Sequence, residues 1–198
     1  MILGIDTSAG QCAVALLGDG VFTRKVAMQR GHAEALMGLI DDVLTEAGAE
    51  YAALTKIGVC TGPGSFTGVR VGVAAARGLA LGLGIPAIGV SRLEALAATA
   101  PPGRVSAVVP MRPGAWARQD FDAERQVQSD PDIADHPEPS PGFTLAADPG
   151  DAEAVLADPV VIARLADAAQ DRPRPAPVYL GPAAAAPSKI QPPRMLAP

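Results

Sequence analysis

The sequence predicts a mixed α/β fold with a firm first half and a smaller, loop-rich second half. Three apolar runs at residues 2–6, 12–17 and 21–26 come first, and segments of strand and helix character then alternate to residue 99. Antiparallel strands followed by this alternation predict a mixed sheet covered by helices. Hydrophobic residues make up 48% of the chain and charged residues 19%, a globular composition that argues against disorder.

Turn and capping signals mark the elements of the first half. Gly18-Asp19-Gly20 separates two apolar runs and predicts a hairpin. Leu36, Ile40 and Val43 recur with a helical period within residues 31–47, and Gly48 follows. The remaining pattern predicts strands at 57–60 and 87–90, a helix at 65–83, and a helix from Ser91 to about 99 with Glu94 in the capping-box position.

The second half is rich in proline, and the chain has 20 prolines in all. A strand is expected at 105–109, one or two more within 116–128, a loop at 130–141, and helices at 151–156 and 159–169. We expect three units: a first lobe at 1–100, a reduced second lobe at 104–182, and a Pro/Ala-rich tail at 183–198.

Charge and composition exclude several functions. The net charge is −5, so the chain lacks the basic footprint of a protein that binds nucleic acid by itself. No signal peptide is visible, and the apolar run 78–91 is too short to span a bilayer. Cys12 and Cys60 lie in apolar runs and are expected to be buried free thiols. A cytoplasmic protein without a membrane partner is predicted.

The glycine turn at residues 62–68 follows a predicted strand and opens a predicted helix. It is not a Walker loop, because Gly68 is followed by Val69-Arg70 and no Lys-Ser/Thr pair is present. A dinucleotide site fits poorly, because an antiparallel hairpin precedes the turn. The alternative is a packing surface, since small residues recur every four positions: Gly64, Gly68, Gly72, Ala76, Ala80 and Gly84. The pattern leaves open whether an internal helix or a partner's helix packs there.

Two further motifs carry candidate chemistry. Asp6-Thr7-Ser8 follows the first strand and resembles the first phosphate loop of the actin, Hsp70 and sugar-kinase superfamily, although a turn bonded to its own backbone is an open alternative. His32 opens a helix, but the residue four positions later, where a second metal ligand would stand, is Leu36. The residues therefore predict no catalytic or metal site. The one candidate cofactor contact is a nucleotide lying near Asp6, Thr7 and Ser8.

Together these motifs resemble the TsaB family, which is required to make threonylcarbamoyladenosine in transfer RNA. The resemblance covers about residues 1–100. It rests on residues 2–8, on His32-Ala33-Glu34, and above all on the glycine motif at residues 62–72. It implies an actin-like (ribonuclease H-like) fold with two lobes, of which the second is small and loop-rich. The second half departs from the family at Pro110-Met111-Arg112-Pro113-Gly114 and at Tyr179-Leu180-Gly181, so no site is assigned there.

The resemblance also implies a non-catalytic role. The chain would bind and stabilise TsaD together with TsaE, for transfer of threonylcarbamoyl to adenosine 37 of tRNAs that read codons beginning with A. It would bind no cofactor alone, while ATP or ADP and a metal could enter through the complex, and tRNA would be contacted only through the complex. A homodimer through the first-lobe helices stays open. The expected partner interface is Gly64, Ser65, Phe66, Thr67, Gly68, Arg70, Gly72, Val73, Ala76 and Arg77.

A function of another class is the alternative: a small nucleotide-dependent phosphotransferase or an M22-type peptidase. The peptidase needs metal ligands that the sequence does not supply, and the kinase needs a second phosphate loop and a full second lobe. The scaffold hypothesis is therefore preferred.

Overall fold

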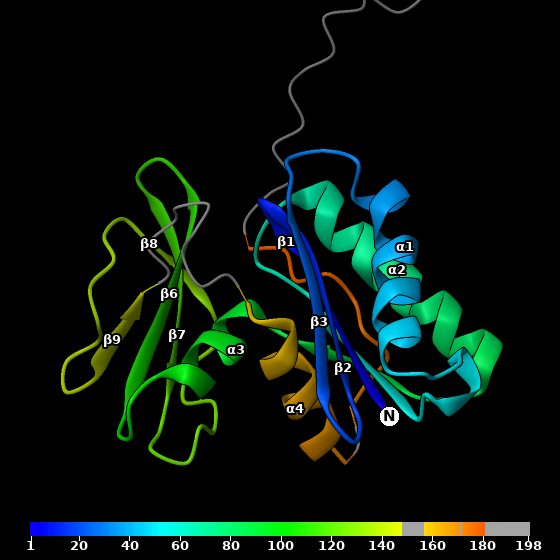
Figure 1. Cartoon of the computed structure of the whole chain (residues 1–198). Helices are drawn as coiled ribbons and strands as arrows, with labels where there is room; N and C mark the ends of the chain where they lie inside the picture. The colour runs from blue at the N-terminus through cyan, green and yellow to red at the C-terminus, as the bar shows by residue number, and fades with distance from the viewer. Residues whose placement is uncertain (148–156, 171, 181–198) are drawn as a thin grey trace, which may run out of the picture.

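The computed structural model describes residues 1–147, 157–170 and 172–180, and it contains two sheets (Figure 1). The first sheet has the order β3-β2-β1-β4-β5, in which β1 pairs antiparallel with β2 and parallel with β4. Its strands are β1 (Ile2–Ala9), β2 (Gln11–Leu17), β3 (Val21–Ala27), β4 (Lys56–Cys60) and β5 (Ala87–Val90). The predicted mixed sheet is confirmed.

Helices cover both faces of this sheet. On one face, α1 (His32–Glu46) packs on β2 and α2 (Phe66–Leu83) packs on β1 and β4. Residues of β1 alternate between the faces, so Leu3 and Ile5 join the apolar core beneath these helices, together with Leu36 of α1. The core is aliphatic, as a chain with 4% aromatic residues requires.

The opposite face of the first sheet is covered by a helix from the end of the described chain. α4 (Pro159–Ala168) lies against β1, β2 and β4, between the two sheets (Figure 1). Gly4 and Gly58 make this close approach possible, because a Cβ at Gly4 would overlap the carbonyl oxygen of Pro159 and one at Gly58 would lie 2.7 Å from the Cβ of Ala166. The division at 104–182 stays a prediction, but α4 lies within that range and packs on the first lobe.

The second sheet has the order β8-β7-β6-β9, and β6 pairs antiparallel with β7 and parallel with β9. This is the order and direction of β3-β2-β1-β4 in the first sheet. Its strands are β6 (Val105–Arg112), β7 (Ala115–Phe121), β8 (Asp132–Ala134) and β9 (Thr144–Ala147), and α3 (Arg92–Thr99) packs on β6. No helix separates β8 from β9, whereas α1 separates β3 from β4, so the second sheet is a reduced copy of the first.

Most predicted elements of the first half are confirmed, including the Ser91 cap, whose Oγ accepts a hydrogen bond from the Glu94 backbone N–H at 2.9 Å. Three elements were missed: the 3₁₀ turn η1 (Tyr51–Ala53), β8 and β9. The predicted loop at 130–141 is wrong at Asp132–Ala134, because this short edge strand pairs with β7 and is too polar to show an alternating pattern. The predicted helix at 151–156 and the tail at 183–198 lie outside the described residues.

Candidate functional site

The motif Asp6-Thr7-Ser8 ends β1 and is almost fully buried, at 0%, 1% and 0% exposure. The Asp6 carboxylate accepts hydrogen bonds from the Ser8 backbone N–H at 2.9 Å and from Gln11 Nε2 at 3.3 Å. The Thr7 hydroxyl donates to the Gly68 carbonyl oxygen at 2.7 Å. The Asp6 carboxylate therefore bonds within residues 6–11, the Thr7 hydroxyl bonds to α2, and Ser8 alone of the three lines a cleft. Nucleotide proximity at these residues stays a prediction.

The glycine turn packs directly on this motif. The Ser65 backbone N–H donates to the Ser8 carbonyl oxygen at 2.6 Å, and the Ser65 hydroxyl caps α2 by accepting from the Gly68 backbone N–H at 3.2 Å. A Cβ at Gly64 would overlap the Ser8 carbonyl oxygen, and one at Gly68 would overlap that of Thr7. The two motifs that the sequence singled out thus form one packed unit.

The small-residue stripe of α2 faces the inside of the molecule. Gly68, Gly72, Ala76 and Ala80 are buried, and a Cβ at Gly72 would overlap the Thr7 hydroxyl. The stripe admits strand β1, not a helix from a partner. The proposed physical reason for the predicted interface is therefore wrong, because the every-fourth-residue pattern does not distinguish a strand from a helix as the neighbour.

The predicted interface residues accordingly divide into two sets. Gly68, Gly72, Val73 and Ala76 are buried within the chain. Gly64, Ser65, Phe66, Thr67 and Arg70 are exposed, and Arg77 is half-buried. Only the second set can meet another molecule in this conformation, and its role in partner binding stays a prediction.

An aromatic and cationic cluster occupies the start of the exposed face of α2. The Arg70 guanidinium lies 3.6 Å from the centre of the Phe66 ring, and its Nε donates to the Tyr179 hydroxyl at 2.7 Å. Phe66 and Tyr179 are 48% and 50% exposed, and their ring centres are 5.5 Å apart. Tyr179 belongs to the C-terminal segment 172–180, where Val178 donates its backbone N–H to the Thr61 carbonyl oxygen at 2.9 Å.

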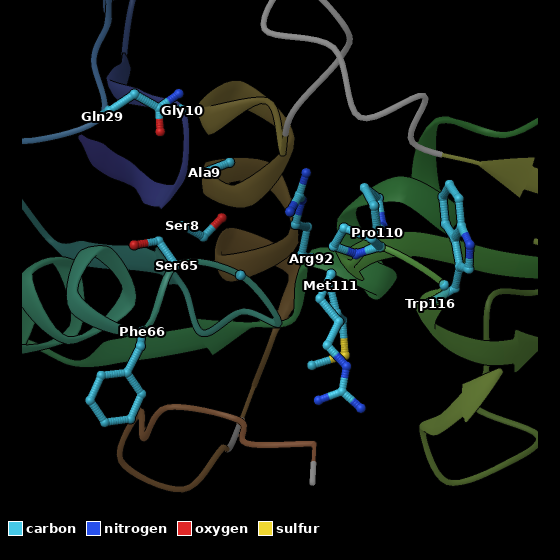
Figure 2. A pocket seen from close by; sticks show the side chains of 14 residues that line it. Ser8, Ala9, Gly10, Gln29, Ser65, Phe66, Arg92, Pro110, Met111 and Trp116 are labelled. Atoms are coloured by element: carbon cyan, nitrogen blue, oxygen red, sulfur yellow. The ribbon is translucent and has the colours of Figure 1, made fainter. Parts of the chain in front are cut away.

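A cleft of ≈ 800 Å³ lies between the two lobes (Figure 2). Ser8, Ala9 and Gly10 line it from the end of β1, and the turn at 110–114 lines it from the end of β6. These are equivalent places in the two sheets. Figure 2 shows Ser8 and Ser65 on one side, Pro110 and Trp116 on the other, and Arg92 of α3 between them. Sequence reasoning assigned no site residue to this second wall because its residues depart from the family pattern.

The two helix positions considered for metal ligands at the start of α1, residues 32 and 36, are buried. His32 is 7% exposed with Nε2 3.3 Å from the Ala9 carbonyl oxygen, and Leu36 is 1% exposed. In residues 1–147, 157–170 and 172–180 the side chains of His, Cys, Asp and Glu form no group of three or more that could hold a metal ion.

Both cysteines are buried and free, as predicted. Burial raises the pKa of the Cys60 thiol to about 12, and the Asp6 carboxylate adds to the increase. Burial and then Asp6 likewise raise the pKa of Cys12 to about 11. Neither thiol is therefore an activated nucleophile, because the thiolate is the reactive form.

Comparison with known proteins agrees with the motifs. A family model described as TsaD, tRNA N6-adenosine threonylcarbamoyltransferase, matches residues 17–111. The chain is 41% identical over 97 residues to the tRNA threonylcarbamoyladenosine biosynthesis protein TsaB of Escherichia coli K12, and 41% identical over 101 residues to that of Haemophilus influenzae. These matches span 48% and 50% of this chain but only 42% of each relative, so the chain aligns with less than half the length of the relatives.

The structural match extends further along the chain. YeaZ from Pseudomonas aeruginosa superposes with a TM-score of 0.74 and 26% identity, over 90% of this chain and 99% of that one. Two sheets of one strand order, with helices and a cleft between them, define an actin-like, ribonuclease H-like α/β protein. Within that class, the chain is similar in sequence to proteins named TsaB over about half of its length and in structure to YeaZ over 90% of it, which agrees with the resemblance of its motifs.

Among the described residues, α2 is long and apolar enough to cross a membrane by length and composition alone, with 33% of it buried. A core helix passes the same test, and α2 packs on β1 and β4.

Proposed function

We propose that this chain is a non-catalytic subunit of the machinery that transfers threonylcarbamoyl to adenosine 37 of tRNAs reading codons that begin with A. In this proposal it is cytoplasmic and acts by binding and stabilising a TsaD homologue, with a TsaE homologue joining the complex. The observation that carries the proposal is the 41% identity to proteins named for threonylcarbamoyladenosine biosynthesis, over the half of the chain that builds the first lobe.

The site geometry supports a binding role over a catalytic one. The side-chain polar groups of Asp6 and Thr7 already form hydrogen bonds within the chain, and the second position of an H-x-x-x-H pair is the core residue Leu36. By contrast, α2 presents exposed aromatic and cationic side chains, which are enriched where proteins meet. Binding that favours the active form of a partner would raise activity without a reacting group in this chain.

Reconstitution tests the proposal. The chain is mixed with the TsaD and TsaE homologues of the same organism, the complex is isolated by size exclusion, and threonylcarbamoyl transfer to tRNA is measured with and without the chain. We expect a stable complex and a loss of most transfer activity when the chain is omitted. Full activity without the chain, or no complex, would end the proposal.

The matched family model and some relatives carry the name of the transferase itself, so the same assay includes the chain alone. Turnover by the isolated chain would establish an enzyme in place of an accessory subunit. Calorimetry with ATP and magnesium tests the phosphotransferase alternative in the same way.

A further inference from the structure

The C-terminal segment 172–180, called the strap below, follows α4 and begins on β5, the edge strand of the first sheet. The Arg172 guanidinium donates to the Gly89 carbonyl oxygen of β5 at 3.0 Å. It also forms a two-pronged ion pair with Glu94 of α3, at 3.0 and 2.5 Å. Pro175 is buried, and its Cβ lies 3.3 Å from where a Cβ of Gly89 would stand. The start of the strap is therefore bonded to β5 and to α3 at once.

The end of the strap contacts both lobes through two consecutive residues. The Tyr179 hydroxyl accepts from Arg70 Nε of α2 at 2.7 Å, and its ring centre lies 5.5 Å from that of Phe66. The next residue, Leu180, packs against the apolar core that α3 forms with β6 and β7 of the second lobe. Neighbouring positions of one backbone segment thus hold the first lobe and the second lobe.

Between these two points the strap passes α3, which lies with α4 between the two sheets (Figure 1). α3 is fixed to the second lobe: it packs on β6, and Arg125 donates to the carbonyl oxygens of Ala100 and Pro101 just beyond its end, at 2.9 and 2.6 Å. Toward the first lobe it contributes the small side chain of Ala95 to an apolar cluster with Ile162 of α4. Packed helices can slide past one another by small shear motions, so the boundary between α3 and the first lobe is where the lobes can move.

The strap bridges this boundary at both of its ends, and the cleft between the lobes opens beside it. Phe66 lines the cleft and also stacks on Tyr179, while the first residue of α3, Arg92, lines the cleft from the other side of the boundary. A change in the position of α3 relative to α2 would therefore change the cleft and strain the contacts of the strap together.

We propose that the strap clamps α3 and the second lobe against the first lobe and so sets the width of the cleft. When its contacts are released, the second lobe and α3 move away from α2 and the cleft opens. This inference concerns the isolated chain and does not depend on the proposed function.

Distances between the lobes test the proposal. Gln29 and Arg112 are exposed and line opposite walls of the cleft, so nitroxide labels on Gln29→Cys and Arg112→Cys report its width by pulsed electron spin resonance. The native cysteines are buried. The labelled full-length chain is compared with the same chain carrying Arg172→Gln or Leu180→Ser. We expect one narrow distance distribution with the intact strap, and in each strap variant a longer distance in at least about a fifth of the molecules.

Two matched control variants leave the strap intact. Arg24→Gln breaks a partly exposed ion pair with Glu46 within the first lobe, as Arg172→Gln breaks one at the boundary. Leu145→Ser removes a partly exposed leucine from β9, as Leu180→Ser removes one from the strap. Both controls should keep the narrow distribution of the chain with the intact strap.

Acrylamide quenching of Trp116 is a second readout that needs no label, because this single tryptophan lines the cleft. We expect the quenching constant to rise at least about twofold in the strap variants and to change little in the controls. Urea unfolding checks that each variant is folded, and Arg172→Gln keeps the test valid if Leu180→Ser does not fold, because its ion pair is partly exposed. Unchanged distances and quenching in a folded strap variant would overturn the proposal. So would the same longer distance in the controls or in the chain with the intact strap.

Discussion

At the scale of single residues, the glycine motif allows β1 to pack closely against the start of α2. The Thr7 carbonyl oxygen lies where a side chain of residue 68 would begin, and the Thr7 hydroxyl lies where one of residue 72 would begin. Thr7 in turn donates to the Gly68 carbonyl oxygen. The motif therefore needs glycine at these positions for a structural reason, which is the close packing of α2 on the end of β1.

Gly68→Ala should destabilise the protein by about 3 kcal/mol or more, because the added methyl overlaps backbone that cannot move without shifting β1. Urea unfolding at neutral pH measures the effect. Gly38→Ala on α1 is the control, since a Cβ there meets nothing within 4 Å, and it should stabilise by up to about 1 kcal/mol. Equal unfolding midpoints for the two variants would contradict the packing described for Gly68.

The thiols give a second prediction. At pH 8 a disulfide reagent such as DTNB should label neither thiol of the folded protein, and unfolding in guanidinium should make both thiols reactive. Fast labelling of Cys60 in the folded state would contradict the burial of its side chain.

The raised thiol pKa values also set a pH dependence. The folded state holds its thiol protons more tightly than the unfolded state, whose pKa is near 9.0, so their contribution to stability is complete below pH 9. The free energy of unfolding should fall as pH rises from 9 toward 12. Urea midpoints at pH 8 and pH 10 measure this fall, and Cys60→Ala should make it shallower.

At the scale of elements, α2 has two faces with different uses. One face carries the glycines that β1 requires, and the other carries Gly78 and Gly82, where a Cβ would meet nothing within 4 Å. On the inner face, glycine avoids a clash with β1. On the outer face, no contact within the described chain requires it.

Gly82→Ala should raise the stability of the isolated chain by about 0.5–1 kcal/mol, because alanine has the higher helix propensity and the added methyl finds open space. Thermal or urea unfolding measures the gain, with Gly72→Ala as the destabilising counterpart on the inner face. A loss of stability in Gly82→Ala would mean that its surroundings are not open.

Periodicity and capping chemistry predicted most elements of the first lobe, since Leu36, Ile40 and Ser91 act locally through burial or a cap. The contacts that could not be predicted are those between segments distant in the sequence. The pattern of Gly68 and Gly72 could not specify whether a strand or a helix lies opposite. The return of α4 to the first sheet depends on Gly4 and Gly58, which are distant in sequence and read as ordinary strand residues.

The candidate site divides in the same way. Asp6 and Ser65 were identified from local motifs, whereas Tyr179 and Arg174 reach α2 only through the path of the C-terminal segment. The sequence has a short apolar stretch at 178–180, but nothing in it indicates which surface it contacts.

At the scale of the whole molecule, two sheets of one strand order place equivalent turns across a common cleft. Ser8 of the first lobe and Pro110 of the second lie on opposite walls. Trp116 is the single tryptophan of the chain and lines the second wall, so its fluorescence reports on the cleft.

ATP with magnesium should leave the emission of Trp116 unchanged in the isolated chain, because the side-chain polar atoms of Asp6 and Thr7 are already hydrogen-bonded to other groups of the chain. A fluorescence titration to millimolar nucleotide measures this, with AMP as the control for absorption by the base. A saturable change at micromolar ATP would contradict the prediction.

The position of α4 has a consequence for how the protein is made. The ribosome completes residues 1–100 first, but the face of their sheet that carries Gly4 and Gly58 stays uncovered until residue 168 has emerged. At about 5–20 residues per second, synthesis of the intervening stretch takes roughly 3–14 seconds. During that interval the nascent first lobe exposes an apolar surface, and a chaperone that recognises such surfaces would find its target there.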